Sequence, residues 1–256
     1  MNLSRSRVLI SNDDGITAPG LKVLVRAAKT LFKEVWVVAP ETEQSATSHS
    51  LTLRRPLRIR RVSAKHFAVD GTPTDSVLLG VREIMKDNPP DLVLSGINRG
   101  GNLGEDITYS GTVAAAMEGT LLGVPSVALS QYFRNRQAVH WRTAEIWTAK
   151  VLKQLAKSEN WPKNILMNVN FPDVLPDDVT GVEVVRQGRR KIGGELQSGI
   201  DPRGDAYFWI GAQREEEKFR AGSDLEAVER GAVAVTPLSM DLTHTGTLRK
   251  LKDVLK

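Results

Sequence analysis

Short apolar runs alternate along the chain with segments whose apolar residues recur at helical spacing. The first run predicts a β-strand over residues 8–11. In the next segment, 18–32, Leu21 and Leu24 begin a series of apolar positions three or four residues apart, which indicates an amphipathic helix. A second apolar run predicts a strand over 35–38. The chain therefore opens with a strand–helix–strand unit, the building block of parallel sheets.

The same alternation continues through most of the sequence. It predicts further helices over 73–85, 113–122 and 142–157, and further strands over 91–95, 125–130 and 165–169. The first of these helices has a capping hydroxyl at Thr72, followed by Pro73 at its first position. Strands that alternate with helices are typical of parallel sheets, so the predicted fold class is α/β with a doubly wound, mainly parallel sheet.

Residues 41–70 interrupt this pattern. A polar loop over 41–50 precedes segments 51–62 and 66–70, which resemble strands of an antiparallel excursion. Leu57 and Ile59 alternate there with arginines, which indicates a strand with one solvated face. Binding of nucleic acid through this basic cluster is the alternative. The cluster consists of Arg54, Arg55, Arg58, Arg60 and Arg61.

The C-terminal part is less regular. Residues 188–212 are basic, glycine-rich and irregular until the aromatic run 207–210, which predicts a hairpin. An exposed aromatic patch is costly, so this hairpin either packs against a partner subunit or folds back on its own domain. The pattern also predicts a short helix over 224–230, a strand over 232–236 and a basic terminal helix over 247–255.

Length and composition set the broad class. A chain of 256 residues has ample core for one large α/β domain, with or without an appendage. It has no cysteine, which excludes disulfides and thiolate chemistry and fits a reducing compartment. No apolar run is long enough to serve as a leader or membrane span, so a cytoplasmic protein is predicted. The net charge of +5 suits anionic substrates without requiring nucleic acid.

The first candidate for chemistry is Asn12-Asp13-Asp14-Gly15, in the turn after the first strand. At the carboxyl edge of a parallel sheet, such turns bind ligands. Adjacent carboxylates repel each other, and a divalent metal is the simplest group to hold them together. An ordinary turn is the alternative, because aspartate and glycine both suit turn geometry.

The second candidate is the loop after the strand that begins at residue 91. Asn98 and Asn102 lie there, and an amide oxygen is a neutral ligand for a hard cation, although either residue could simply cap a turn. A hydroxyl from the polar loop would complete the set, and by chemistry alone Ser45, Ser48 and Ser50 are equally eligible. Two carboxylates, an amide oxygen, a hydroxyl and waters suit octahedral Mg²⁺ or Mn²⁺.

The third candidate is Ser110-Gly111-Thr112 at a helix start, where main-chain N–H groups, hydroxyls and the helix dipole can bind phosphate. Capping of the helix by Ser110 is the alternative. His49, in the polar loop, could act as an acid or stabilise charge, but a packing or surface role is the stronger interpretation. The sequence has no Walker A loop, no dinucleotide-binding fingerprint and no G-x-S-x-G elbow. Their absence argues against an NTPase, a dinucleotide-dependent oxidoreductase and a serine hydrolase.

Taken together, these motifs resemble the survival protein SurE family of metal-dependent nucleotidases. They occur in the order Asn12-Asp13-Asp14-Gly15, 39–45, 71–75, Ser95-Gly96-Ile97-Asn98 and Tyr109-Ser110-Gly111-Thr112. The C-terminal part of the chain also resembles this family, in segments 201–204, 207–211, 235–238 and 241–243. The resemblance therefore covers nearly the whole chain.

The resemblance implies a Rossmann-like core over 1–185 and a C-terminal extension over 186–256, together forming one domain. In this family the extension carries the hairpin and exchanges arms between subunits, giving homodimers or homotetramers. It also implies one divalent ion per subunit, Mg²⁺ or Mn²⁺, held by Asp13, Asp14, Ser45 and Asn98. The expected activity is hydrolysis of nucleoside monophosphates, with 3′-nucleotides and polyphosphate as further substrates in some members. Neither a membrane nor nucleic acid is an expected partner.

The mechanism expected from these residues is attack on phosphorus by a metal-activated water, with Asp13, Asp14 and Asn98 as the catalytic residues. The phosphate would be held by Asn12, Asn102, Ser110, Gly111 and Thr112. An aspartyl-phosphate intermediate is the rival route. Two other functional classes remain open: hydrolysis of another phosphoester, and non-catalytic nucleotide or RNA binding through the arginine-rich strand.

Overall fold

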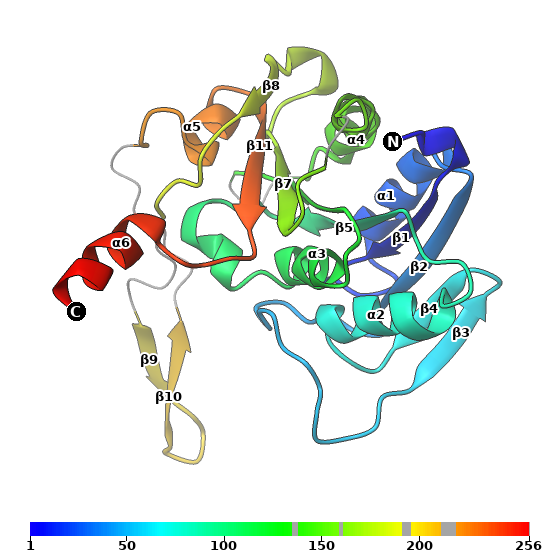
Figure 1. Cartoon of the computed structure of the whole chain (residues 1–256). Coiled ribbons are helices and arrows are strands. Elements are labelled where there is room, and N and C mark those ends of the chain that lie inside the picture. The colour runs from blue at the N-terminus through cyan, green and yellow to red at the C-terminus, as the bar shows by residue number, and fades with distance from the viewer. Residues whose placement is uncertain (135–137, 159–160, 191–195, 211–218, 256) are drawn as a thin grey trace.

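The fold is built on one large twisted sheet, seen in the computed structural model of the chain (Figure 1). The structure describes residues 1–134, 138–158, 161–190, 196–210 and 219–255. Within these residues the sheet has nine strands. In the order in which they lie across the sheet, they are β3 (Ile59–Ser63), β4 (His66–Val69), β2 (Glu34–Pro40), β1 (Arg7–Ser11), β5 (Leu92–Arg99), β6 (Ser126–Gln131), β7 (Ile165–Phe171), β11 (Ala232–Ser239) and β8 (Gly181–Val184).

The strands from β4 to β7 are all parallel, which confirms the predicted doubly wound, mainly parallel sheet. From β1 the chain moves outward through β2 and β4, and then returns to the other side of β1 to add β5, β6 and β7. The direction of winding therefore reverses between β1 and β5. In open α/β sheets, ligands bind at this switch point, beyond the carboxyl ends of the strands.

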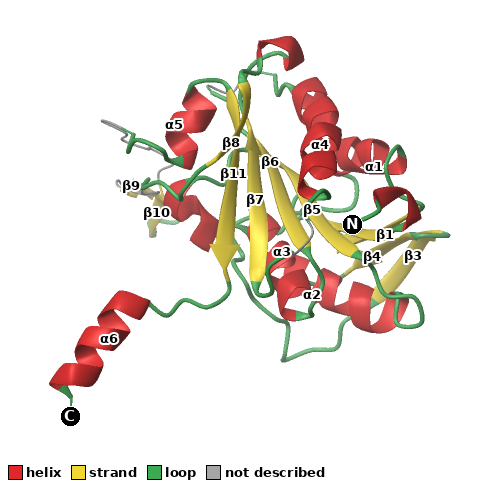
Figure 2. Ribbon diagram, turned by 45° about the horizontal axis from the view of Figure 1, so that its top comes forward, coloured by secondary structure: helices red, strands yellow, loops and turns green. Residues whose placement is uncertain are grey.

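Helices cover both faces of the sheet (Figure 2). They are α1 (Pro19–Lys29) and α4 (Trp141–Leu155) on one face, and α2 (Pro73–Leu79) and α3 (Gly111–Leu121) on the other. A shorter helix, α5 (Asp224–Glu229), packs against β11. The strands between these layers are almost entirely buried, as expected for parallel strands with helices on both sides.

Several predicted boundaries need correction. The strand predicted over 51–62 begins only at Ile59, and all five residues of β3 are exposed, so the expectation of a single solvated face is wrong. The reason is that β3 is an edge strand beyond the reach of the covering helices. The helix predicted over 73–85 is α2 followed by a π-helical turn, Gly80–Ile84. The predicted cap is confirmed: the hydroxyl of Thr72 accepts from the N–H of Asp75 at 3.0 Å.

The aromatic run forms a separate hairpin, β9 (Leu196–Ile200) with β10 (Ala206–Ile210), which extends away from the sheet (Figure 1). Phe208 and Trp209 are 65% and 68% exposed, so the hairpin does not fold back on its own domain. The terminal helix α6 (Thr245–Val254) buries none of its residues and also extends from the body (Figure 2). Residues 191–195 and 211–212 of the region predicted as irregular lie outside the described residues.

Between the hairpin and α6 the chain returns to the central sheet. β11 pairs antiparallel with β7 and parallel with β8, so part of the predicted extension is built into the core. The predicted boundary at residue 185 is therefore a division of the chain only. The structure does not divide into two parts there, because β11 from the extension belongs to the same sheet as the core strands. In the part of the chain that the structure describes, no helix is both long and apolar enough to cross a bilayer, and the cytoplasmic location stays a prediction from sequence.

Candidate active site

The turn after β1 and the loop after β5 lie side by side, because the two strands are paired in parallel with Ser11 opposite Ser95. A cavity of about 360 Å³ opens at this edge of the sheet. All four predicted metal ligands line it, namely Asp13, Asp14, Ser45 and Asn98. Asp13 and Asp14 lie in the turn after β1, Ser45 lies in the polar loop after β2, and Asn98 lies in the last part of β5. The expectation of a loop at Asn98 is wrong, because β5 continues to Arg99 and Asn98 pairs there with Ser130 of β6.

Asp13 is deeply buried, with only 4% of its surface exposed. Burial raises the pKa of its carboxyl to about 7, and the neighbouring charge of Asp14 adds to this rise. Hydrogen bonds from the hydroxyl and N–H of Thr112 oppose the shift in pKa. Gly111 allows this approach, because a Cβ there would lie only 2.7 Å from the Cβ of Asp13.

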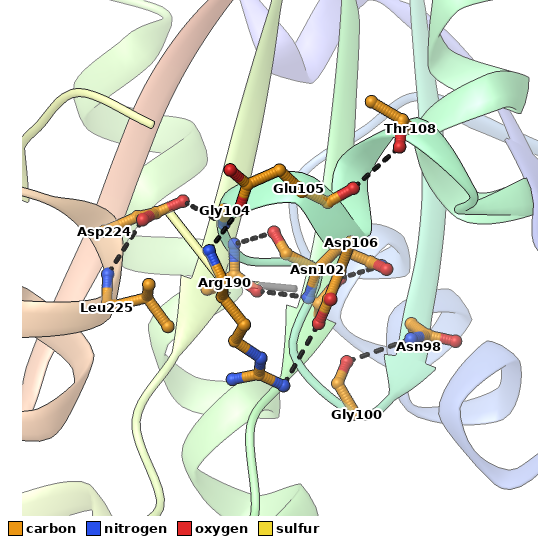
Figure 3. Close-up of polar contacts among 12 residues, drawn as sticks. Asn98, Gly100, Asn102, Gly104, Glu105, Asp106, Thr108, Arg190, Asp224 and Leu225 are labelled. Carbon is orange, nitrogen blue, oxygen red and sulfur yellow. Dashed lines mark hydrogen bonds and ion pairs between the residues drawn. The ribbon is translucent and has the colours of Figure 1, made fainter. Parts of the chain in front are cut away.

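Asp14 is half-buried, and burial followed by the charge of Glu43 raises the pKa of its carboxyl. The N–H of Arg99 donates to Oδ2 of Asp14 at 3.2 Å and opposes that rise. The Nδ2 of Asn98 donates to the main-chain oxygen of Gly100 at 2.9 Å, which orients the amide and leaves its Oδ1 as an acceptor (Figure 3). The hydroxyl of Ser45 donates to Glu43 at 2.8 Å, so its lone pairs remain for a ligand.

The donor set fits a hard divalent cation. Burial raises the pKa values of both adjacent carboxylates, and the charge of Arg99 opposes this rise only at Asp14. The other donors are a neutral amide and a hydroxyl oxygen. Among the described residues, no group of three or more His, Cys, Asp or Glu side chains is placed to hold a metal. A cation here would depend on the two aspartates together with the neutral oxygens.

The residues predicted to bind phosphate divide into two groups. Asn102 and Ser110 line the cavity, and Ser110 also caps α3 by accepting from the N–H of Val113 at 3.0 Å. Asn12, Gly111 and Thr112 are not among the lining residues. Thr112 and Gly111 contact Asp13, as described above. The amide of Asn12 donates to the oxygen of Gly15 at 2.9 Å and shapes the turn, in which Gly15 has φ of 93°.

A buried network of amides holds Asn102. Its N–H donates to Oδ1 of Asn170 at 2.8 Å, and its own Nδ2 donates to the hydroxyl of Ser130 at 2.7 Å. The side chains of Asn168 and Asn170 both donate to the carbonyl oxygen of Asn102, at 2.8 and 3.1 Å. Both partners on β7 are fully buried, so the loop after β5 is anchored to the sheet at this residue.

Sequence reasoning missed Asp106, which also lines the cavity. It lies in a 3₁₀ turn, Gly104–Thr108, and forms an ion pair with Arg190 at 3.0 Å (Figure 3). Burial raises the pKa of Asp106 to about 6, although the guanidinium of Arg190 opposes this rise. Asp224 accepts from the N–H groups of Gly104 and Gly188 and so holds the same turn from the other side. No local pattern links these residues, since they come together only through tertiary packing.

His49 is not among the residues that line the cavity. Its Nε2 lies 3.0 Å from Oε2 of Glu118, a buried residue of α3. This contact favours the packing interpretation over a direct chemical role. The loop is held further by Ser48, whose hydroxyl donates to the oxygen of Thr108 at 2.8 Å.

The arginine-rich segment is paired with carboxylates of its own chain. Arg60 lies 2.6 Å from Glu41, and Arg55 lies 3.2 Å from Asp70. None of the five arginines of this cluster lines the cavity. The arrangement matches a solvated edge strand and gives no support to nucleic-acid binding.

Comparisons with known proteins agree with this site. The family model described as "Survival protein SurE" matches residues 8–194. The chain is 63% identical over 249 residues to "5′-nucleotidase SurE" of Paramagnetospirillum magneticum, which covers 97% of this chain and 95% of that protein. It is 54% identical over 253 residues to the protein of the same name from Rhodospirillum rubrum, covering 98% and 96%.

A solved structure shares the fold. The crystal structure of the SurE protein from Aquifex aeolicus matches with a TM-score of 0.85 and 41% sequence identity, covering 98% of this chain and 100% of that one. The match thus includes the hairpin and terminal helix as well as the core. With a family model that matches most of its length and relatives of this identity, the chain belongs to the survival protein SurE family.

Proposed function

We propose that this chain is a divalent-metal-dependent phosphatase that hydrolyses nucleoside monophosphates to nucleoside and phosphate. The observation that carries the proposal is the buried Asp13 beside Asp14, in a cavity that also presents neutral oxygen donors. The relatives named 5′-nucleotidase SurE support it, because they match over nearly the whole chain. The substrates to be tested include 3′-nucleotides and polyphosphate.

Asp13, Asp14, Ser45 and Asn98 would hold one Mg²⁺ or Mn²⁺ per subunit. A bound divalent cation would offset the two carboxylate charges, polarise the phosphoryl group and make water more acidic. The protein's part is to hold the ligands in place: Thr112 fixes Asp13, the N–H of Arg99 fixes Asp14 and the carbonyl of Gly100 fixes Asn98.

Asn102 and Ser110 would bind the phosphoryl oxygens from the side of the cavity next to α3. The positive end of the α3 dipole would stabilise the charge that develops there. We propose water as the nucleophile, since both aspartates are engaged by hydrogen bonds and would serve as ligands. With a substrate whose phosphoryl group is made chiral by oxygen isotopes, direct attack by water is one displacement and should invert the configuration at phosphorus. Net retention, which requires two displacements, would instead establish an aspartyl-phosphate on Asp13 or Asp14.

We also propose that the chain forms a homo-oligomer through its C-terminal region, with the hairpin and α6 exchanged between subunits. The support is that both elements project from the body and expose apolar residues, including Phe208, Trp209 and Val254. In water these surfaces favour burial against another chain.

The central experiment is phosphate release from a panel of 5′- and 3′-nucleoside monophosphates and polyphosphate, with Mg²⁺, Mn²⁺ or EDTA. Asp14→Asn should abolish metal-dependent release while leaving the fold intact. Asp177→Asn is the matched control, because Asp177 is an exposed aspartate that does not line the cavity. Equal activity in EDTA, or full activity of Asp14→Asn, would refute the proposal.

A further inference from the structure

One part of the cavity carries side chains that binding of a metal and a phosphate does not use. Arg99, at the end of β5, and Phe133, just after β6, both line the cavity. The guanidinium carbon of Arg99 lies 5.5 Å from the centroid of the Phe133 ring. Tyr109 also lines the cavity and is 55% exposed. Two aromatic rings and a planar cation therefore border a site whose other polar side chains are carboxylates, amides and hydroxyls.

The main chain and the side chain of Arg99 make different contacts. Its N–H binds Asp14, which fixes the residue beside the predicted metal ligands. Its side chain is exposed and, among the described residues, forms no ion pair within contact distance, although its charge lowers the pKa of Asp14. The guanidinium lies over the Phe133 ring, in a cation–π contact. Phe133 is half-buried, which leaves part of the ring accessible from the cavity.

Gly100 separates this group from the predicted metal ligands. A Cβ built on Gly100 would lie 3.8 Å from Nδ2 of Asn98 and 4.0 Å from Cε1 of Phe133, with nothing closer. The absent side chain thus leaves space between the ligand amide and the aromatic ring. A substrate whose phosphate lies near Asn98 would extend its other end over Gly100 toward Phe133.

We propose that Arg99, Phe133 and Tyr109 form a subsite that binds the base of a nucleotide by stacking. This inference rests on the proposed function and deepens it, because it assigns residues to substrate preference. Every nucleobase has a π-face, so aromatic rings and guanidinium planes can stack on any of the bases. Purines present the larger face and are expected to be preferred over pyrimidines. A phosphate ester without a base gains nothing from this subsite.

The kinetic test compares AMP with ribose 5-phosphate, which carries the same phosphate and sugar but no base. In the wild-type protein, kcat/KM for AMP should exceed that for ribose 5-phosphate by about tenfold or more, from the strength of base–aromatic stacking. Phe133→Leu should reduce this ratio about tenfold, mainly through KM for AMP. Phe133→Tyr is the matched control, since it keeps the aromatic face and should retain the ratio. If Phe133→Leu lowers kcat/KM by the same factor for both substrates, Phe133 has a structural role only and the inference is overturned.

Arg99→Gln distinguishes a base from a second phosphate as the occupant. If the subsite binds a base, this variant should lower the ratio of kcat/KM for AMP to kcat/KM for ribose 5-phosphate. It should reduce kcat/KM for tripolyphosphate no more than kcat/KM for ribose 5-phosphate. If tripolyphosphate hydrolysis falls most while the ratio is unchanged, the subsite binds a second phosphate and the inference is wrong.

A binding measurement separates this inference from the proposed function, because it needs no turnover. The fluorescence of 2-aminopurine riboside 5′-monophosphate falls when its base stacks, and it can be followed with EDTA present. Quenching that Phe133→Leu loses and Phe133→Tyr keeps would support the subsite even if no substrate were hydrolysed. Absence of quenching in the wild-type protein at millimolar concentration would refute the subsite, whether or not the chain is a phosphatase.

Discussion

The hydroxyl of Thr112 donates a hydrogen bond to Oδ1 of Asp13 and so joins the first turn of α3 to the turn after β1. Thr112 is fully buried and Asp13 nearly so. A hydrogen bond to the charged form of a carboxyl lowers its pKa, and in Asp13 this effect opposes the larger effect of burial. The helix thus helps to keep the carboxylate available as a ligand.

Thr112→Val should therefore weaken metal binding. Valine keeps the shape of threonine but removes the donor, so the pKa of Asp13 rises further and protonation competes with the metal. We expect the dissociation constant for Mn²⁺ at pH 7 to rise about tenfold, the equivalent of one hydrogen bond to a charged group. Titration calorimetry would measure it. Thr112→Ser keeps the hydroxyl and should retain affinity, and an unchanged constant in Thr112→Val would contradict this role.

The metal-free protein should lose stability as the pH rises. Asp13 and Asp106 have pKa values raised from 3.8 to about 7 and about 6, so the folded state holds their protons more tightly than the unfolded state. Their stabilising contribution is complete below about pH 4 and is lost as the pH passes through 6 and 7. In EDTA, Tm should therefore fall between about pH 5 and pH 8. Asp13→Asn should flatten this slope, and a slope unchanged from wild type would contradict the raised pKa of Asp13.

Breaking the contact between His49 and Glu118 should loosen the loop that carries Ser45. The two side chains lie 3.0 Å apart, and Glu118 is fixed on α3. We expect His49→Ala to lower the free energy of unfolding by about 1 kcal/mol, typical of one lost hydrogen bond. It should also weaken Mn²⁺ binding. His140→Ala is a control, because His140 lies 3.7 Å from Asp173 and does not line the cavity. Equal effects of the two variants on Mn²⁺ binding would rule out a specific role for His49.

Removal of Arg190 should be strongly destabilising. Arg190 and Asp106 are 2% and 4% exposed, and loss of one partner leaves the other charge buried. Arg190→Met should cost about 3–5 kcal/mol in urea unfolding, in the range for a broken buried pair. Asp106→Leu combined with Arg190→Met should recover much of that loss. If the double variant were no more stable than Arg190→Met, the pairing would not be the cause.

Disruption of the hairpin should shift the assembly toward monomer. Trp209→Glu places a charge on a strand that is exposed along its whole length in the single chain. Light scattering coupled to gel filtration should then show a lower mass than for the wild-type protein. Leu175→Glu is the control, because Leu175 is 56% exposed and lies outside the hairpin and α6. A mass unchanged by Trp209→Glu would argue against assembly through this hairpin.

The sequence by itself determined the elements whose signals are local. The strand–helix–strand opening follows from apolar spacing, and the start of α2 follows from Thr72 and Pro73, whose cap closes within one turn. The position of Asp13, Asp14 and Asn98 at one edge could also be predicted, because parallel strands bring their carboxyl ends together. The choice of Ser45 came from family resemblance, since chemistry alone did not separate it from Ser48 and Ser50.

Only the tertiary structure decided the contacts between residues distant in sequence. The exposure of β3 on both faces depends on its place at the edge of the sheet, which its alternating residues do not encode. Thr112 contacts Asp13 instead of lining the cavity, because α3 packs close against the turn after β1. The ion pair of Asp106 with Arg190 and the contact of Arg99 with Phe133 likewise depend on how loops pack across the sheet. The spacing of residues along the chain does not predict such contacts. The burial and the electrostatic surroundings of these side chains depend on neighbours that are distant in sequence and come close only in the folded protein.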